Sequence, residues 1–256
     1  MGADESNKNK DSNSFNITIS QNNIEKKYSP LQSLFNLTPT DKSIYTNPYL
    51  FLCYNFLING CKIEYQKLDE LGDCVAGWRI NPKNGPPGHE KKFKAPNGWI
   101  AVGLKVINLY DNGNNDWLGR DNSPGEWYIA YHGTKTMDSV RGIVNEGFKR
   151  GDGQFYETSP NIHPLTKKKY PYCMKGVYLT PDIDEAKNYT IPIYFSGNIF
   201  RVVLMCRVNP FEVRIASKAD NIEYWIVNGD SFNDVNAKKK DSEVRPYRIL
   251  ISIEKT

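Results

Sequence analysis

Long apolar runs are absent from this 256-residue sequence, and so is a large excess of charge of one sign. No segment approaches the roughly 20 apolar residues that a transmembrane helix needs, and the N-terminus lacks the apolar core of a secretory signal peptide. The formal net charge of +4 is too small to indicate a surface built for nucleic acid or for an anionic membrane. We therefore expect a soluble globular protein without membrane partners.

Cysteine is also scarce. The five cysteines are odd in number and lack the paired spacing of a zinc site, and Cys206 lies in an apolar run as a core residue does. His163 has no second ligand at metal spacing, so we predict no metal site. Reduced thiols fit an intracellular protein best, which places the expected location in the cytoplasm or the nucleus.

Aromatic residues, in contrast, are abundant (Tyr 16, Phe 11 and Trp 5), which favours a sheet-rich structure or a site that stacks planar ligands. Residues 1–27 are rich in Asn, Ser, Lys, Asp and Glu and predict a disordered tail. Residues 28–125 read as an N-terminal extension that can regulate, recognise a substrate or complete the core. Residues 126–256 contain short strands and only two convincing helices, which predicts an α+β domain of small packed sheets.

The strands expected within that domain cover residues 127–131, 176–181, 200–208, 221–227 and 247–253. A helix capped by Asp138 or Ser139 and ended by Gly147 follows the first strand, and a second helix covers residues 182–189. In the extension, residues 48–58 predict a buried helix or two strands, and residues 99–110 are strand-like throughout.

The first strand of the domain ends at His132 and Gly133, where the backbone can turn sharply. His132 is therefore expected at the carboxyl end of a core strand, beside a glycine that leaves backbone amides accessible to a flat ligand. The simpler alternative is a histidine bonded to a neighbouring carbonyl. Tyr178 and Tyr189, eleven residues apart, can face one cleft or simply belong to the core.

Glu223 interrupts an otherwise apolar strand. A carboxylate in such a position points either to solvent from an edge strand or into a site. The residues around it leave both alternatives open.

Taken in order, these segments resemble the PARP-like ADP-ribosyltransferases over about residues 127–254. His132-Gly133-Thr134 is similar to that family's His-Gly-Ser/Thr strand end. Gly176-Val-Tyr178 followed by Ala186-Lys-Asn-Tyr189 is similar to the pair of motifs that sandwiches nicotinamide. The strand with Glu223 resembles the one that carries the third member of the family's His-Tyr-Glu set.

The resemblance implies an ADP-ribosyltransferase-like split β-sheet sandwich with few helices, and NAD as co-substrate. It assigns catalytic roles to Glu223, His132 and Tyr178. It assigns NAD contacts to His132, Gly133, Thr134, Tyr178, Tyr189 and Lys149, with Lys149 placed to meet the pyrophosphate. Because nicotinamide leaves a cationic precursor as a neutral molecule, no general acid is needed, and one carboxylate that holds the ribose 2'-hydroxyl can suffice.

Two departures from the family pattern qualify these expectations. Ala186 stands where family members often have a serine that bonds the nicotinamide amide, which leaves that amide to the Gly133 backbone. The segment between Val208 and Asn221 is short, so we expect transfer of a single ADP-ribose, to a protein or to a nucleic-acid acceptor, by a mono-ADP-ribosyltransferase. The alternatives are an NAD glycohydrolase and a non-catalytic module that binds NAD or ADP-ribose.

Overall fold

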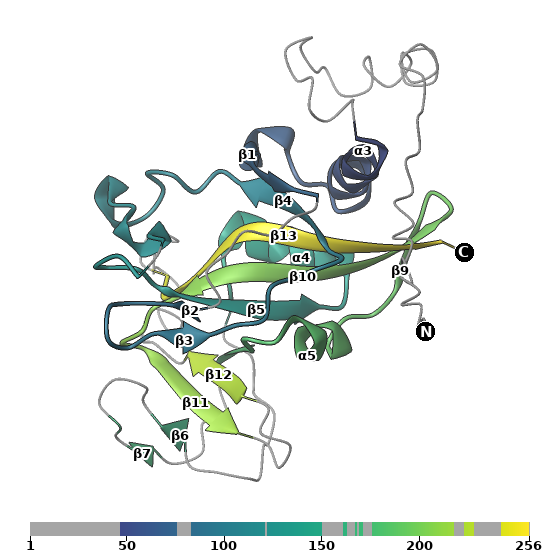
Figure 1. The fold of residues 1–256 in the computed structure, drawn as a ribbon. Coiled ribbons are helices and arrows are strands. Elements are labelled where there is room, and N and C mark those ends of the chain that lie inside the picture. Colours follow the sequence, from purple (N-terminus) through teal and green to yellow (C-terminus); the bar gives the residue numbers. More distant parts are fainter. Residues whose placement is uncertain are drawn as a thin grey trace, which may run out of the picture. The chain divides into compact units, whose positions relative to one another are not determined.

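The computed structural model describes residues 47–75, 83–120, 122–149, 161–162, 167, 169–170, 176–217, 223–227 and 242–255 (Figure 1). The disordered tail predicted over residues 1–27 lies outside this part of the chain. Residues 47–256 form one compact unit. The described strands all pair antiparallel and the helices are few, so the predicted α+β class is confirmed.

The larger sheet has six strands in the order β1-β4-β13-β10-β5, with β9 also paired to β10. Its strands are β1 (Leu68–Cys74), β4 (Ile100–Leu104), β5 (Tyr128–Thr134), β9 (Ile193–Phe195), β10 (Asn198–Val208) and β13 (Val244–Lys255). β10 is buried along most of its length because it pairs on both edges and is covered on both faces, which explains its nearly continuous apolar sequence.

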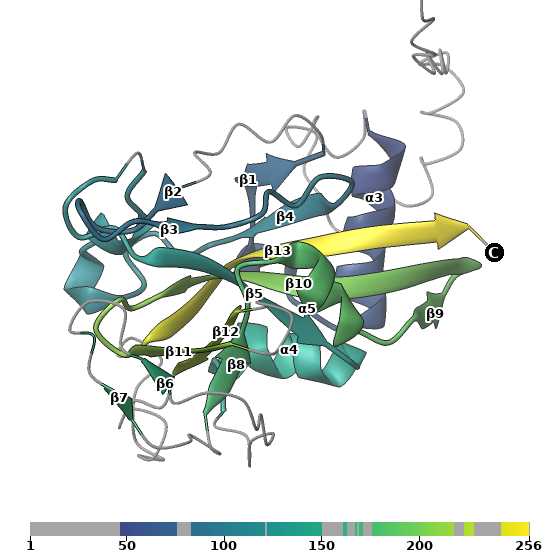
Figure 2. The same ribbon diagram turned by 60° about the horizontal axis from the view of Figure 1, so that its bottom comes forward.

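The smaller sheet has five strands in the order β7-β6-β11-β12-β8. They are β6 (Asn161–Ile162), β7 (Lys169–Tyr170), β8 (Val177–Leu179), β11 (Val213–Ser217) and β12 (Glu223–Val227). Figure 2 shows this sheet beyond β5, on the side away from β4. Two hydrogen bonds between the backbones of Tyr131 and Thr180 connect the two sheets.

Three α-helices are described, namely α3 (Pro48–Asn55), α4 (Met137–Glu146) and α5 (Ile183–Asn188). A π-helical turn, Phe56–Gly60, continues α3. Of the two alternatives predicted for residues 48–58, the buried helix is thus confirmed. Short 3-10 turns cover Tyr65–Lys67, Asp111–Gly113 and Asp116–Leu118, and a small hairpin joins β2 (Lys83–Asn84) to β3 (Lys91–Lys92). Within the described residues, no helix combines the length and apolar composition that a membrane span requires.

α4 and α5 cover opposite faces of the larger sheet (Figure 1). Ile183 and Ala186 of α5 join an apolar cluster with Val203 and Met205 of β10. α4 begins after Thr136, whose side chain accepts a hydrogen bond from the Ser139 amide, and ends at Gly147 with a φ of 87°. The predicted cap at Asp138 or Ser139 is therefore wrong by two or three residues, while the predicted end is confirmed.

The residues predicted as an extension contribute strands to the same sheet as the predicted domain. β1 and β4 precede residue 125, yet β4 pairs directly with β13. The strand predicted over residues 99–110 covers only Ile100–Leu104. Beyond it the chain turns, with the Leu109 amide donating to the Val106 carbonyl and Asn108 at a φ of 60°. Completing the core, one of the three roles considered for the extension, is thus what the described residues 47–125 do.

Candidate functional site

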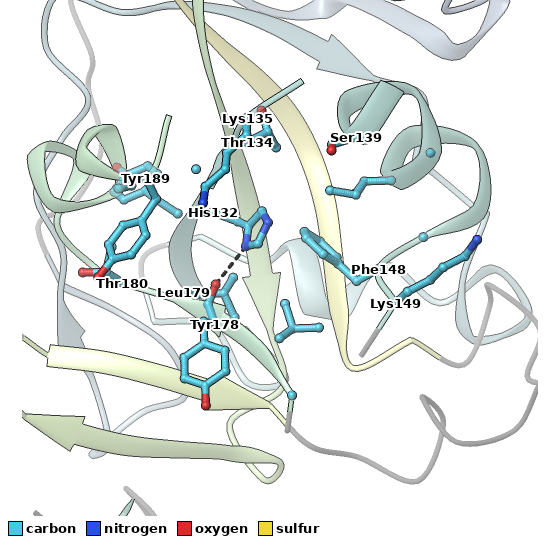
Figure 3. A pocket seen from close by; sticks show the side chains of 18 of the residues that line it. His132, Thr134, Lys135, Ser139, Phe148, Lys149, Tyr178, Leu179, Thr180 and Tyr189 are labelled. Atoms are coloured by element: carbon cyan, nitrogen blue, oxygen red, sulfur yellow. Dashed lines mark hydrogen bonds between the residues drawn. The ribbon is translucent and has the colours of Figure 1, made fainter. Parts of the chain in front are cut away.

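A cavity of about 760 Å³ lies beside the carboxyl end of β5 (Figure 3). Its walls come from β5, α4, the residues after α4, β8, α5 and β12. The volume falls in the range of pockets that hold small molecules. Of the residues predicted to form a site, the cavity brings together His132, Gly133, Thr134, Lys149, Tyr178 and Tyr189.

His132 lies at the centre of the cavity wall (Figure 3). Its Nδ1 is 2.8 Å from the carbonyl oxygen of Tyr178, and since a carbonyl only accepts, Nδ1 carries the hydrogen. Burial lowers the pKa of His132, which favours the neutral ring. Nε2 is then a hydrogen-bond acceptor. The simpler alternative, a histidine bonded to a neighbouring carbonyl, is confirmed, and this bond fixes the orientation of the ring.

Gly133 sits at the edge of β5 that faces the cavity. Tyr131, two residues earlier, exchanges both of its backbone hydrogen bonds with Thr180 on this edge. Because backbone groups alternate between the two edges of a strand, the N–H and C=O of Gly133 also point away from β10. The structure shows a packing reason for the absent side chain as well. A Cβ on Gly133 would lie 2.3 Å from the carbonyl oxygen of Ala186 and 2.9 Å from Cβ of Tyr189, because α5 packs directly on this residue.

Tyr178 and Tyr189 supply aromatic surface on one side of His132 (Figure 3). Tyr178 projects from β8, and its own carbonyl holds His132. Tyr189 follows the last residue of α5 and donates from Oη to Oη of Tyr224 over 3.2 Å. The sequence left a shared cleft and the core as alternatives for these two tyrosines, and both line the cavity.

Thr134 and Lys149 also line the cavity. The Thr134 hydroxyl donates to the carbonyl oxygen of Val202 over 3.0 Å and is buried, so it fastens β5 to β10. The Lys149 side chain is 80% exposed and pairs with Glu146 over 2.5 Å. It can swing to an anionic ligand at little cost, since an exposed ion pair of this kind contributes only about 0–1 kcal/mol.

Glu223 does not line the cavity. Its Oε2 accepts from Nε1 of Trp225 over 3.0 Å, its Oε1 is 3.8 Å from Nζ of Lys91, and its side chain is 37% exposed. Strand register explains the direction. Ile226 lies opposite Tyr178 on β8, so Tyr224 shares that face and Glu223 takes the other one.

Two aromatic residues of the cavity wall, Tyr224 and Phe148, were not predicted from the sequence. Tyr224 is the side chain that β12 presents to the cavity, and it is almost fully buried there. Phe148 packs edge-on against the His132 ring with centroids 5.0 Å apart (Figure 3). The sequence signal for Tyr224 was present, because it is next to Glu223 in the strand that was singled out. Choosing between the two needed the register with β8.

Comparison of the sequence with models of known protein families and with curated proteins finds no match.

Proposed function

We propose that the cavity binds NAD and that the chain is an NAD-dependent mono-ADP-ribosyltransferase with the split-sandwich fold of the PARP-like family. The observation that supports this most is the convergence of His132, Tyr178 and Tyr189 in one cavity. They come from three separate segments, each of which is among those in which the sequence resembles the family.

The cavity fits the nicotinamide end of NAD in its polar and aromatic groups. The Gly133 backbone offers one donor and one acceptor side by side, which matches a carboxamide. Tyr178 and Tyr189 offer faces for the planar ring. Ala186 is buried and carries no hydroxyl, so the backbone alone serves the amide. Nε2 of His132 can accept from a ribose hydroxyl, and Lys149 can reach a phosphate.

In the proposed reaction, the bond between the ribose C1' and the nicotinamide nitrogen breaks, and its electron pair stays on nicotinamide. The positive charge that the pyridinium carried passes to the ribose and is quenched when an acceptor nucleophile bonds to C1' and loses its proton. The enzyme's task is to hold the ribose while that charge is transferred. We propose protein as the acceptor class, with nucleic acid as the alternative.

Transfer of a single unit is supported by the short connection between β10 and β12. A turn at residues 209–212 leads straight into β11, and only residues 218–222 separate β11 from β12. Little chain is left there to bind a growing polymer.

A second candidate function, a module that binds NAD or ADP-ribose without turnover, is favoured by the position of Glu223. The carboxylate that the family resemblance assigns to the ribose faces away from the cavity. We therefore base the proposed function on His132 and Tyr178 and assign no role in it to Glu223.

One experiment separates these functions. The purified chain is incubated with NAD labelled in its adenylate half, with and without cell extract, while calorimetry measures NAD affinity. Label on an acceptor together with free nicotinamide supports the transferase, and nicotinamide release without labelled acceptor indicates a glycohydrolase. Binding without release supports the module. Absence of NAD binding refutes the proposal.

A further inference from the structure

A carboxylate stands behind the cavity at a place that the sequence did not indicate. Tyr224, a residue of the cavity wall, donates a hydrogen bond from Oη to Oε1 of Glu185 on α5. Asn188, one turn later on the same helix, donates from Nδ2 to the other oxygen, Oε2 of Glu185, over 3.1 Å. Glu185 is half-buried, so its charge is only partly screened by solvent.

The direction of these hydrogen bonds fixes where the hydroxyl hydrogen of Tyr224 points. A carboxylate accepts but does not donate, so the hydroxyl hydrogen of Tyr224 is committed to Glu185. Tyr189 then donates to Tyr224 over 3.2 Å. In this series of hydrogen bonds, the hydroxyl hydrogens of Tyr189 and Tyr224 both point toward Glu185, and each hydrogen bond polarises the next. The oxygen of Tyr224 is consequently electron-rich, and the carboxylate of Glu185 lies directly behind this residue of the cavity wall.

We infer that Glu185, acting through Tyr224, makes the cavity selective for the oxidised, cationic form of a nicotinamide dinucleotide over the reduced, neutral form. The inference rests on the proposed function, because it concerns the ring that Tyr178 and Tyr189 contact there. Glu185 is a positioning residue, since it orients and polarises Tyr224 and does not itself line the cavity. Glu185 and Tyr224 together supply negative charge beside the cavity, whereas Glu223 faces away from it.

The test compares the affinities of the intact chain for NAD and for NADH by calorimetry, so no turnover is required. The parent protein is expected to bind NAD more tightly than NADH. Glu185→Gln keeps the shape and an acceptor for Tyr224 but removes the charge, so the ratio of the two dissociation constants should fall roughly fivefold. A purely structural role for Glu185 would weaken both ligands equally and leave the ratio unchanged.

Tyr224→Phe removes the link and should lower the ratio by a similar factor. Because Glu185 acts through Tyr224, the double variant should show no further loss, which is the signature of coupled residues. Asp184→Asn, a change of the same kind at the neighbouring position, is the control, since Asp184 is exposed and pairs with Lys94. Thermal unfolding of each variant shows whether the fold is kept, and Tyr224→Phe tests the inference even if Glu185→Gln does not fold.

Equal affinity of the parent for NAD and NADH, or an unchanged ratio in Glu185→Gln and Tyr224→Phe, overturns the inference while leaving NAD binding intact. The inference is also overturned if the ratio of the two dissociation constants falls in Glu223→Gln but not in Glu185→Gln or Tyr224→Phe, because the selectivity then comes from the charge of Glu223. Failure of the parent to bind either nucleotide refutes the proposed function itself, and the inference with it.

Discussion

Nδ1 of His132 donates to the carbonyl oxygen of Tyr178 over 2.8 Å, so a cavity residue of the larger sheet is held in place by a cavity residue of the smaller one. The bond fixes the imidazole in the tautomer that leaves Nε2 as an acceptor. His132→Ala removes this acceptor, and the dissociation constant for NAD should rise roughly tenfold, the scale of one hydrogen bond. Calorimetry measures the change. An unaltered dissociation constant would exclude His132 from the binding site.

The same histidine predicts a pH dependence of stability. The unfolded chain protonates His132 near its ordinary pKa of 6.5, whereas the folded chain, with a lowered pKa, does so only at lower pH. In that window the unfolded state binds more protons, so the free energy of unfolding should fall as the pH drops below 6.5. His132→Gln lacks this loss. Urea unfolding of both proteins should be measured from about pH 7 down to about pH 5. As the pH falls, the free energy of unfolding of the parent should decrease relative to that of the variant.

Tyr178 is predicted to bind through its ring face more than through its hydroxyl. Tyr178→Ala should weaken NAD binding by on the order of 1 kcal/mol or more, whereas Tyr178→Phe should retain most of the affinity. Tyr194→Ala is the matched control, because Tyr194 is 72% exposed on β9 and does not line the cavity. Equal losses in Tyr178→Phe and Tyr178→Ala would show that the hydroxyl, and not the ring, makes the contact.

Gly133 is predicted to tolerate no side chain. The Cβ of Gly133→Ala would meet the Ala186 carbonyl oxygen at 2.3 Å, so α5 must shift, and the free energy of unfolding should fall by roughly 1–3 kcal/mol. Gly142→Ala offers the opposite case within α4, where the added Cβ meets no atom within 4 Å. That change should stabilise the protein by about 0.5–1 kcal/mol. Chemical denaturation of the two variants tests the contrast.

Asp73 should titrate near neutral pH. Burial is the main cause, and it raises the pKa of Asp73 from 3.8 to about 7. Hydrogen bonds from Gly103 N (2.9 Å) and Tyr54 Oη (3.0 Å) act in the opposite direction and lower the pKa. Because the folded state holds the proton more tightly, this group costs stability as the pH rises from about 4 to 7. Asp73→Asn removes the charge and keeps an acceptor oxygen for Gly103 N, while its Nδ2 can donate to Tyr54 Oη in place of the hydrogen bond that Tyr54 donates to Asp73.

The asparagine variant should therefore exceed the parent in the free energy of unfolding by on the order of 1 kcal/mol at pH 8, since Asp73 is only partly buried. The difference should shrink toward zero near pH 4. A difference that is independent of pH would show that packing, and not ionisation, distinguishes the two side chains.

Local sequence patterns were sufficient to predict the elements that hold the site. The apolar run before His132, the positive-φ glycine at residue 147 and the acidic start of the helix after Pro181 are all short-range signals, and β5, α4 and α5 occur where they indicate. The exact cap of α4 was missed because Thr136, Asp138 and Ser139 are all good capping residues. Only the geometry selects Thr136.

Long-range pairing was not predictable in the same way. Nothing in residues 68–104 states that β4 pairs with a strand some 150 residues later, because that register is set by tertiary packing. The choice between Glu223 and Tyr224 has the same origin. A shift of one residue in a strand exchanges its two faces, and only the pairing of Ile226 with Tyr178 decides which face meets the cavity.

The place of β13 in the sheet has a consequence for biosynthesis. This strand, residues 244–255, lies between β4 and β10 and pairs with both, although it is the last of the described elements in the chain. During translation, β1 and β4 cannot join β10 and β5 until β13 has left the ribosome. The half-sheets made earlier leave apolar faces and strand edges unpaired, so we expect the nascent chain to be prone to aggregation until β13 is added.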